Sequence, residues 1–446
     1  MASVGLSPKF FLTSGFTNML VSRTNFMPTT TLFKVLSLKN LGDSMKVGLV
    51  FGVSELASPE AFREEAANFV RVLEQDFDVV GGEIIQSRSD FRKLKEKINF
   101  NDVDALVLFP LTGGTEGFLK EFSVFRRPTV FYGNPFNNSL AAAIELREYF
   151  RDRLIPSTVV KSSEELKAAL LAYDDMKDVL DRFLRARIGL IGRVSPWLIN
   201  EKLDIPYTHI SLKKFYEYYE KTTAEEGWEA VKEIVENAEE IKEPDRESLA
   251  KAGRVYVAIK RILEDYHLKG FTVGCFDLIG KIGTTPCLAL AMFNAQGIPA
   301  ACEGELNALI GMMIIRKFFD EPAFMGNLAD FDENHVVIAH CTAPLVSKYV
   351  LRTHFESGRG VGVAVEFPPG KATLFKIRGR HAVVAGVEVE GNEFLESRCR
   401  TQVRLKLEDA PEFVDGTLGN HHLLAYVDPE ELSDLLSELG FEVMLY

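Results

Sequence analysis

The strongest constraint on the fold is an alternation of short apolar runs and helix-like segments through most of the chain. Residues 47–51 and 104–110 are nearly uninterrupted apolar runs, whereas residues 58–76 and 139–149 have the apolar spacing of amphipathic helices. Strands that alternate with helices are typical of a parallel sheet with right-handed crossovers. We therefore predict a first α/β domain over residues 45–180.

The same alternation resumes further along the chain. Residues 188–191 and 270–276 are strand-like, and residues 247–269 form a strongly amphipathic helix pattern between them. We predict a second Rossmann-like α/β domain over residues 181–335.

The pattern changes after residue 336. Short strand-like segments follow one another, with Gly and Pro between several of them, at residues 361–365, 371–376, 382–390, 401–406 and 422–427. This is typical of a mostly-β domain, barrel-like or sandwich-like, over residues 336–446. The predicted fold class is thus α/β: two Rossmann-like parallel α/β domains followed by a C-terminal mostly-β, barrel-like domain.

Residues 1–44 differ from the rest of the chain. They contain no acidic residue before Asp43 and are rich in Ser, Thr and Phe. They lack an Arg-rich amphipathic helix and a clear apolar signal region. Because a first strand pattern follows Met45 directly, we expect residues 1–44 to be a disordered extension or a mis-assigned start.

Composition restricts the partners. A net charge of -13 over 446 residues argues against a nucleic-acid binder, which needs a basic surface. No apolar run is long enough to span a membrane. The five cysteines are scattered and form no CxxC pair, which indicates a reducing compartment. We expect a cytoplasmic protein that acts on a small molecule.

Acidic and histidine side chains are concentrated in a few places late in the chain. Glu303 and Glu305 follow a small-residue segment, Asn327 lies in the next polar stretch, and His340 ends an apolar run. His421 and His422 open another apolar run. Carboxylate, amide oxygen and imidazole suit Mn²⁺, and also Mg²⁺, Co²⁺ or Zn²⁺. We predict that these places meet at one metal site.

Each of these residues also has an ordinary structural interpretation. Glu305 can be a charge at a helix N-terminus, Asn327 a turn residue and His340 a buried core histidine. Adjacent residues on a strand face opposite ways, so at most one of His421 and His422 points at the site. Asp330 and Asp332 read as a solvated loop.

Two further places can bind a substrate. Thr112, Gly113 and Gly114 follow an apolar strand pattern, where open α/β sheets bind ligands, although a tight turn explains the glycines equally well. His354 binds substrate or caps a loop. The candidate substrate-binding residues are therefore Thr112, Gly113, Gly114 and His354.

A metal with open positions suggests a reaction. It can hold two adjacent sugar oxygens, polarise the carbonyl and lower the pKa of the neighbouring hydroxyl. A nearby carboxylate can then move a proton between C1 and C2. This chemistry is aldose–ketose isomerisation through an enediol.

Several motifs resemble the L-fucose isomerase / L-arabinose isomerase superfamily. The motifs are Cys302-Glu303-Gly304-Glu305, Phe324-Met325-Gly326-Asn327, His340-Cys341-Thr342 and Gly419-Asn420-His421-His422. Thr112-Gly113-Gly114-Thr115-Glu116 resembles the N-terminal domain of its fucose-isomerase-like branch. The resemblance covers nearly all of residues 45–446. It implies two α/β domains, a C-terminal β-rich domain, Mn²⁺-dependent sugar isomerisation, and assembly into homo-oligomers, either trimers or hexamers.

The resemblance also implies roles for single residues. Glu303 takes the place of an acidic metal ligand that also transfers a proton, and His340 and His421 or His422 take the places of ligand histidines. Glu303, Glu305 and Asn327 are the candidate catalytic residues, and the candidate metal ligands are Glu303, Asn327, His340, His421 and His422.

The chain departs from the family pattern at Asn327. Characterised members have a carboxylate about there, and an amide cannot exchange a proton near neutral pH. Either Glu305, Asp330 or Asp332 supplies the second carboxylate, or the chemistry differs. The alternatives are a non-catalytic sugar-binding protein, or a different metal-dependent epimerase or lyase of a sugar or sugar phosphate.

Overall fold

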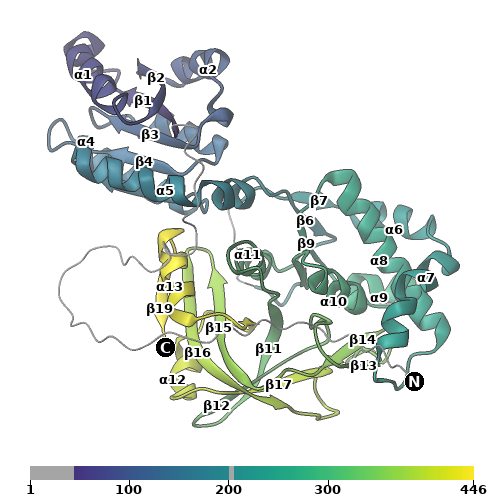
Figure 1. Ribbon diagram of the computed structural model, residues 1–446. Helices are drawn as coiled ribbons and strands as arrows, with labels where there is room; N and C mark the ends of the chain where they lie inside the picture. Colours follow the sequence, from purple (N-terminus) through teal and green to yellow (C-terminus); the bar gives the residue numbers. More distant parts are fainter. Residues whose placement is uncertain (1–44, 200–204) are drawn as a thin grey trace, which may run out of the picture. The chain divides into compact units, whose positions relative to one another are not determined.

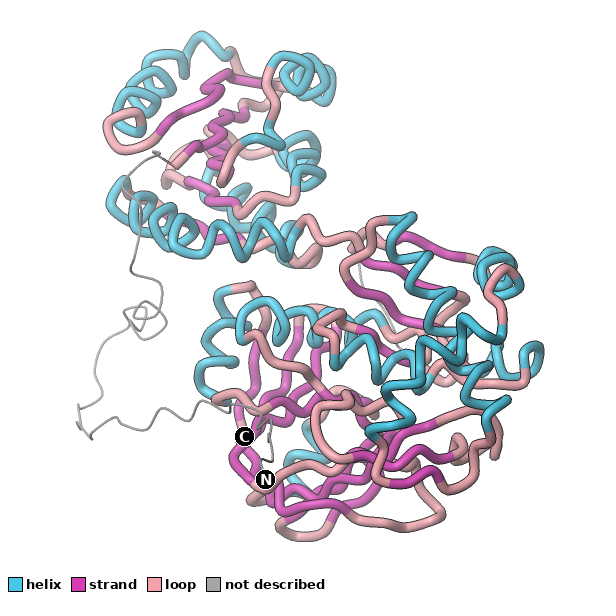
Figure 2. The backbone as a smooth tube through the Cα atoms, turned by 45° about the vertical axis from the view of Figure 1, so that its right-hand side comes forward, coloured by secondary structure: helices cyan, strands magenta, loops and turns pink. Residues whose placement is uncertain are grey.

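The structure is a computed structural model that describes residues 45–199 and 205–446 (Figures 1 and 2). The predicted extension over residues 1–44 lies outside the described residues. The described part contains two parallel sheets, a closed antiparallel barrel and a small third sheet. The prediction of parallel α/β sheets and a C-terminal β-barrel is confirmed.

The first sheet has five parallel strands in the order β2-β1-β3-β4-β5. Apolar residues alternate between its two faces, so that Leu49 and Phe51 of β1 contribute to one cluster and Val50 to another. Helices α1 and α5 supply the first cluster, and α2 and α4 the second. The elements are β1 (Lys46–Gly52), α1 (Arg63–Leu73), β2 (Asp78–Ile85), α2 (Arg88–Lys97), β3 (Ala105–Pro110), α3 (Glu116–Leu119), β4 (Thr129–Tyr132), α4 (Ser139–Arg151), β5 (Ser157–Val160) and α5 (Ser163–Leu184).

The second sheet has four parallel strands in the order β10-β9-β6-β7. Helix α8 packs against α6, α7 and α10. The elements are β6 (Ile188–Ile191), β7 (Thr208–Ile210), α6 (Leu212–Glu220), α7 (Ala224–Asn237), α8 (Arg246–Tyr266), β9 (Gly270–Val273), α9 (Phe276–Ile282), α10 (Cys287–Ala295), β10 (Ala300–Cys302) and α11 (Leu306–Ile314).

The barrel is a ring of six antiparallel strands in the order β15-β18-β11-β12-β17-β16, and it closes because β15 also pairs with β16. These strands are β11 (Phe324–Phe331), β12 (His335–His340), β15 (Gly370–Arg378), β16 (His381–Asn392), β17 (Thr401–Lys406) and β18 (His421–Ala425). Helices α12 (Ala410–Gly416) and α13 (Pro429–Glu438) follow, and β19 (Glu442–Leu445) pairs with β16 in parallel. Strand β8 (Glu240–Ile241) joins β13 (Tyr349–Arg352) and β14 (Gly362–Val365) in the small sheet.

Strand β11 was not anticipated from the sequence, which left a turn open as one interpretation of Asn327 and indicated a solvated loop at Asp330. The strand is hidden in the sequence because its residues show no regular alternation of apolar and polar types, and its second half is only partly buried or exposed. Asn327 lies within it, opposite His421 of β18 and Ala339 of β12.

Helix α11 connects the second sheet to the barrel. It contacts β9 and β10 of the sheet and β15 and β18 of the barrel. The carboxyl edge of the second sheet therefore lies next to the ends of barrel strands. Among the described helices, none combines the length and the apolar character needed to cross a membrane.

Candidate metal centre and active site

The turn between β10 and α11 carries Glu303 in an unusual backbone conformation. Glu303 has a φ of 62° and Gly304 a φ of 75°, both in the left-handed region. A Cβ on Gly304 would lie 2.6 Å from the carbonyl oxygen of Arg193, so the turn requires glycine there. The Ser195 N–H donates to the Glu303 carbonyl oxygen at 2.9 Å. Such strain at a buried carboxylate is characteristic of functional sites.

Glu303 converges with two histidines of the barrel. His340 ends β12 and His421 begins β18, and the three side chains place potential ligand atoms within 4.8 Å of one another. The Nε2 atoms of both histidines lie 3.6 Å from Oε1 of Glu303. All three residues are buried. A carboxylate and two imidazoles that face one point form a donor set for a divalent metal ion.

The second ring nitrogen of each histidine is held by another side chain. Thr342 Oγ1 lies 2.8 Å from Nδ1 of His340, and Glu305 Oε2 lies 2.5 Å from Nδ1 of His421. This arrangement orients a histidine so that its Nε2 faces the metal. The Nε2 atom of His421 is buried and has no hydrogen-bond partner, a position that a bound cation would satisfy. The residues present therefore fit a divalent metal ion.

Glu305 and Lys376 form a buried ion pair behind His421. The Lys376 ammonium donates to Glu305 Oε1 at 2.9 Å and to the His421 carbonyl oxygen at 2.8 Å. Burial opposes ionisation of Glu305, but the bonds from His421 and Lys376 outweigh it and lower its pKa to about 2. Both carboxylate oxygens of Glu305 are thus engaged in holding His421 and Lys376.

Electrostatics keep Glu303 ionised. Burial disfavours its charge, yet the facing imidazoles of His340 and His421 hold the pKa of Glu303 well below its usual range. Burial likewise disfavours the imidazolium form of His421, but Glu303 and Glu305 outweigh burial and raise its pKa to about 9. In the metal-free protein His421 therefore carries a proton between two carboxylates.

Trp197 is a site residue that the sequence did not reveal. Its indole N–H donates to Oε2 of Glu303, and its half-exposed ring packs edge-on against Phe276, with ring centroids 4.8 Å apart. Phe276 in turn contacts the ring of His354 at 5.9 Å. The only available signal was the position of Trp197 just after the end of β6, because α/β sheets bind ligands at the carboxyl ends of their strands. Lys376 had no signal, since its role depends on how the barrel closes.

His422 points away from Glu303. Its Nε2 lies 2.6 Å from Thr417 Oγ1, its Nδ1 lies 2.7 Å from the Asn420 carbonyl oxygen, and its ring contacts Phe413. Burial lowers its pKa to about 3. His422 is therefore a neutral, satisfied core histidine.

Asn327 is engaged by barrel neighbours. Its Oδ1 accepts from Asn420 Nδ2 at 2.5 Å, and its Nδ2 donates to the Ala339 carbonyl oxygen at 3.2 Å. These contacts use its amide to tie β11 to β12 and to the loop before β18.

The other carboxylates that were considered lie in exposed ion pairs. Asp330 pairs with Arg398, and Asp332 pairs with His335 and Arg404. Of the three alternatives for a second carboxylate, Glu305 is the one whose contacts connect it to the triad.

The predicted substrate-binding residues lie in two places. Thr112 accepts from the Ser54 N–H at 2.8 Å, and the Gly113 N–H donates to the Asn137 carbonyl oxygen at 2.7 Å, so these contacts tie loops of the first sheet together. His354 lies closer to the triad. Its Nδ1 is 3.1 Å from Ser357 Oγ, and burial, with the nearby His340, lowers its pKa to about 4.

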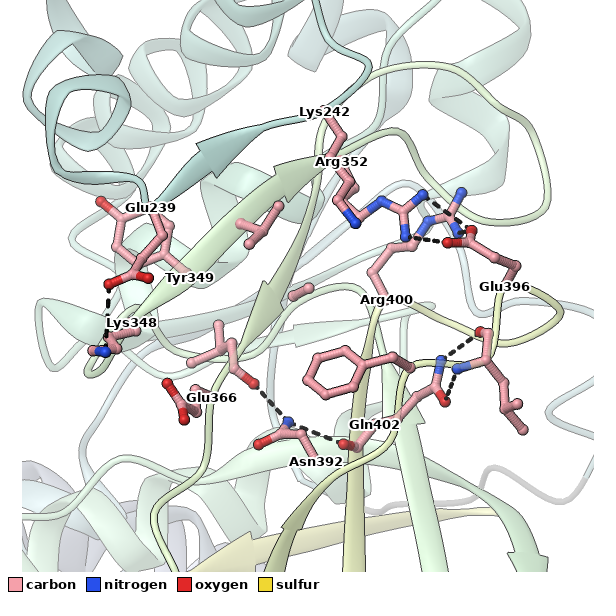
Figure 3. Close-up of a pocket in the computed structure, with 15 residues that line it drawn as sticks. Glu239, Lys242, Lys348, Tyr349, Arg352, Glu366, Asn392, Glu396, Arg400 and Gln402 are labelled. Atoms are coloured by element: carbon pink, nitrogen blue, oxygen red, sulfur yellow. Dashed lines mark hydrogen bonds and ion pairs between the residues drawn. The ribbon is translucent and has the colours of Figure 1, made fainter.

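Of two cavities in the described part of the chain, one lies at the site. One of about 190 Å³ is lined by Trp197, Glu305, Lys376 and His421, and therefore lies beside the triad. A larger one of about 250 Å³ lies between the small sheet and the barrel and includes none of the triad residues (Figure 3). The smaller cavity is the one placed for chemistry at the triad.

Comparison with known proteins gives distant relatives. The chain is similar to two proteins named sulfoquinovose isomerase, from Priestia aryabhattai and Priestia megaterium. Each is 23% identical over 403 residues, which cover 82% of this chain and 90% of the relative. A sulfoquinovose isomerase from a Clostridium strain is 28% identical over 143 residues, 29% of this chain and 32% of the relative. No family model matches the chain.

Proposed function

We propose that this protein is a metal-dependent aldose–ketose isomerase, an intramolecular oxidoreductase that acts on a sugar. The observation that carries the proposal is the buried group of Glu303, His340 and His421 with the unpartnered Nε2 of His421. The sulfoquinovose isomerases, which align over most of their length, support the same class of reaction. We assign the fucose/arabinose type on the sequence motifs.

Glu303, His340 and His421 would hold the ion, and one carboxylate with two imidazoles suits Mn²⁺, Co²⁺ or Zn²⁺. We propose Mn²⁺, with Mg²⁺ or Co²⁺ as substitutes, because the motifs resemble those of the Mn²⁺-dependent L-fucose and L-arabinose isomerases. When bound, the ion supplies polarisation of the sugar carbonyl and acidification of the neighbouring hydroxyl. The histidines keep their Nε2 lone pairs directed inward through the contacts with Thr342 and Glu305.

Glu303 is the carboxylate that this chain has available for proton transfer between C1 and C2. It is ionised, and its Oε2 is oriented by the Trp197 indole N–H. Glu305 is less suited, because His421 and Lys376 occupy both of its oxygens. Asn327 cannot exchange a proton near neutral pH. We therefore assign Glu305 and Asn327 to positioning rather than to proton transfer.

The test is a turnover assay on protein stripped with chelator and reloaded with Mn²⁺. Sulfoquinovose and a panel of aldoses are supplied, with Glu303→Gln as the inactive variant and His422→Gln as the matched control. Turnover that requires the metal and disappears only in Glu303→Gln is the expected result. Turnover that survives chelation, or survives in Glu303→Gln, would exclude the mechanism.

A second candidate function is sugar binding without turnover. The observation that favours it is Asn327, which stands where the resembling family has a carboxylate, and which is committed to Asn420 and Ala339. This alternative predicts sugar-dependent thermal stabilisation and no isomerisation of any sugar in the panel. Assembly into a homo-trimer or hexamer remains part of the proposal and is checked by light scattering.

A further inference from the structure

The cavity beside the triad has an unusual distribution of charge. Its wall includes the buried ion pair of Glu305 and Lys376, the ligand His421, and Arg378. Arg378 donates from Nη1 to the Leu418 carbonyl oxygen at 3.3 Å. Across residues 45–199 and 205–446, no carboxylate forms an ion pair with Arg378.

The charges of this wall sum to one positive charge. Glu305 contributes -1, and Lys376 and Arg378 contribute +1 each, while a His421 that holds a metal is neutral. The larger cavity differs, because its arginines Arg352 and Arg400 both pair with Glu396 (Figure 3). The uncompensated guanidinium next to the triad is therefore available to an anion from solution.

Both positive residues of the cavity wall lie on strand β15, so the strand determines where the positive charge lies relative to the triad. Lys376 and Arg378 are two residues apart on β15, so their side chains leave the same face of the strand, with Cα atoms about 7 Å apart. Lys376 contacts the carboxylate that holds His421, and Arg378 follows one step further along the wall. A sugar whose carbonyl end lies at the triad can thus direct its opposite end toward Arg378.

We infer that this cavity is an anion subsite for the substrate, with Arg378 as the residue that determines specificity. The substrate class is an aldose that carries a tetrahedral oxyanion, a sulfonate or a phosphate, at the end opposite its carbonyl. Planar guanidinium groups bind such groups through two parallel N–H donors. The inference rests on the proposed function and narrows it to anionic sugars. It also accords with the relatives, which are named for a sulfonated sugar.

The test is equilibrium binding to the Mn²⁺-loaded protein, by calorimetry. The probes are sulfoquinovose, glucose 6-phosphate, and quinovose, which is the same sugar without the sulfonate. The variants are Arg378→Met, Arg378→Lys and, as the control, Lys371→Met, which removes an exposed cation from the same strand. Melting temperature and Mn²⁺ affinity of each variant show that the fold and the metal site persist.

We expect Arg378→Met to weaken binding of the anionic sugar by about tenfold to a hundredfold while binding of quinovose stays the same. Arg378→Lys should retain part of the affinity, and Lys371→Met all of it. Tighter binding of sulfoquinovose than of glucose 6-phosphate would identify the sulfonate as the preferred anion of the subsite, and the reverse order would identify the phosphate.

Two results would overturn the anion subsite. One is a wild-type protein that binds anionic sugars no more tightly than quinovose. The other is an Arg378→Met variant that loses both kinds of sugar equally or neither. Failure of the isomerase function looks different, because bound sulfoquinovose that is not converted leaves the subsite intact.

Discussion

Glu305→Gln is the most informative perturbation of this site, because the substitution keeps the shape of the side chain and removes its charge. Glu305 bonds Nδ1 of His421 at 2.5 Å and the Lys376 ammonium at 2.9 Å. The side chains of Lys376 and Glu305 are only 8% and 2% exposed, so solvent cannot replace the lost partner. The variant should therefore lose both stability and metal affinity.

The magnitudes follow from burial. Removing one partner of a buried ion pair costs about 3–5 kcal/mol, because the other charge stays buried and unpaired. Loss of a residue that orients a ligand histidine lowers metal affinity about 10–100-fold. Glu217→Gln is the matched control, since Glu217 pairs with Lys214 at 3.0 Å but the side chains are 45% and 41% exposed. The control should change stability by less than about 1 kcal/mol.

The assays are denaturant unfolding of the metal-free proteins and calorimetric titration with Mn²⁺. Both tryptophans of the chain, Trp197 and Trp228, lie in the second α/β segment, so their fluorescence reports unfolding near the site. The double variant Glu305→Gln/Lys376→Met should regain most of the lost stability, because the unpaired charge is gone, while its Mn²⁺ affinity stays low. A Glu305→Gln protein that is as stable as Glu217→Gln and binds Mn²⁺ like the wild type would show that Glu305 neither stabilises the fold nor orients His421.

Three further predictions follow from the same contacts. Because the pKa of His421 is raised to about 9, a proton must leave this histidine before a cation binds, so Mn²⁺ affinity should rise about tenfold per pH unit from about pH 6.5 toward 9. Over the same interval the metal-free fold should lose the stability that the protonated His421 contributes. Calorimetry and melting curves across pH measure the two effects, and a pH-independent Mn²⁺ affinity would contradict the first. Trp197→Phe removes the N–H donor to Glu303 and should lower kcat about tenfold or more with little change in Mn²⁺ affinity. Steady-state kinetics on the Mn²⁺-loaded protein measures kcat, and an unchanged kcat would show that Trp197 does not orient Glu303. His421→Gln should abolish tight Mn²⁺ binding while His422→Gln retains it, and equal losses in the two variants would show that the assignment of their faces is incorrect.

The sequence was sufficient for the classes of structure and for selecting Glu303, His340 and His421 as candidate ligands, because both leave local patterns. Apolar runs alternating with helix patterns predicted the parallel sheets, and short strand-like segments predicted the barrel. Glu303, His340 and His421 were recognisable because they stand at the ends of apolar segments, and the structure brings them together within 4.8 Å. The rule of alternating faces anticipated that only one of His421 and His422 would join them.

Contacts that depend on long-range pairing could not be predicted. Lys376 looks like an ordinary strand residue, and its ion pair with Glu305 exists only because β15 closes the barrel next to α11. Glu305 was predicted to be catalytic. The local sequence cannot distinguish a catalytic glutamate from one that orients His421, because the contact between the two residues forms only in the folded chain. Strand β11 was missed because its residues show no regular alternation of apolar and polar types, and its second half is only partly buried or exposed.

The metal site can be tested by a crystal structure of the full chain grown with Mn²⁺, with anomalous diffraction recorded at a wavelength where manganese scatters strongly. We expect one strong anomalous peak within ligand distance of Glu303, His340 Nε2 and His421 Nε2, and its loss in Glu303→Gln crystals grown in the same way. A peak at another group of residues, or an empty triad at a saturating concentration of Mn²⁺, would show that these three residues are not the metal site.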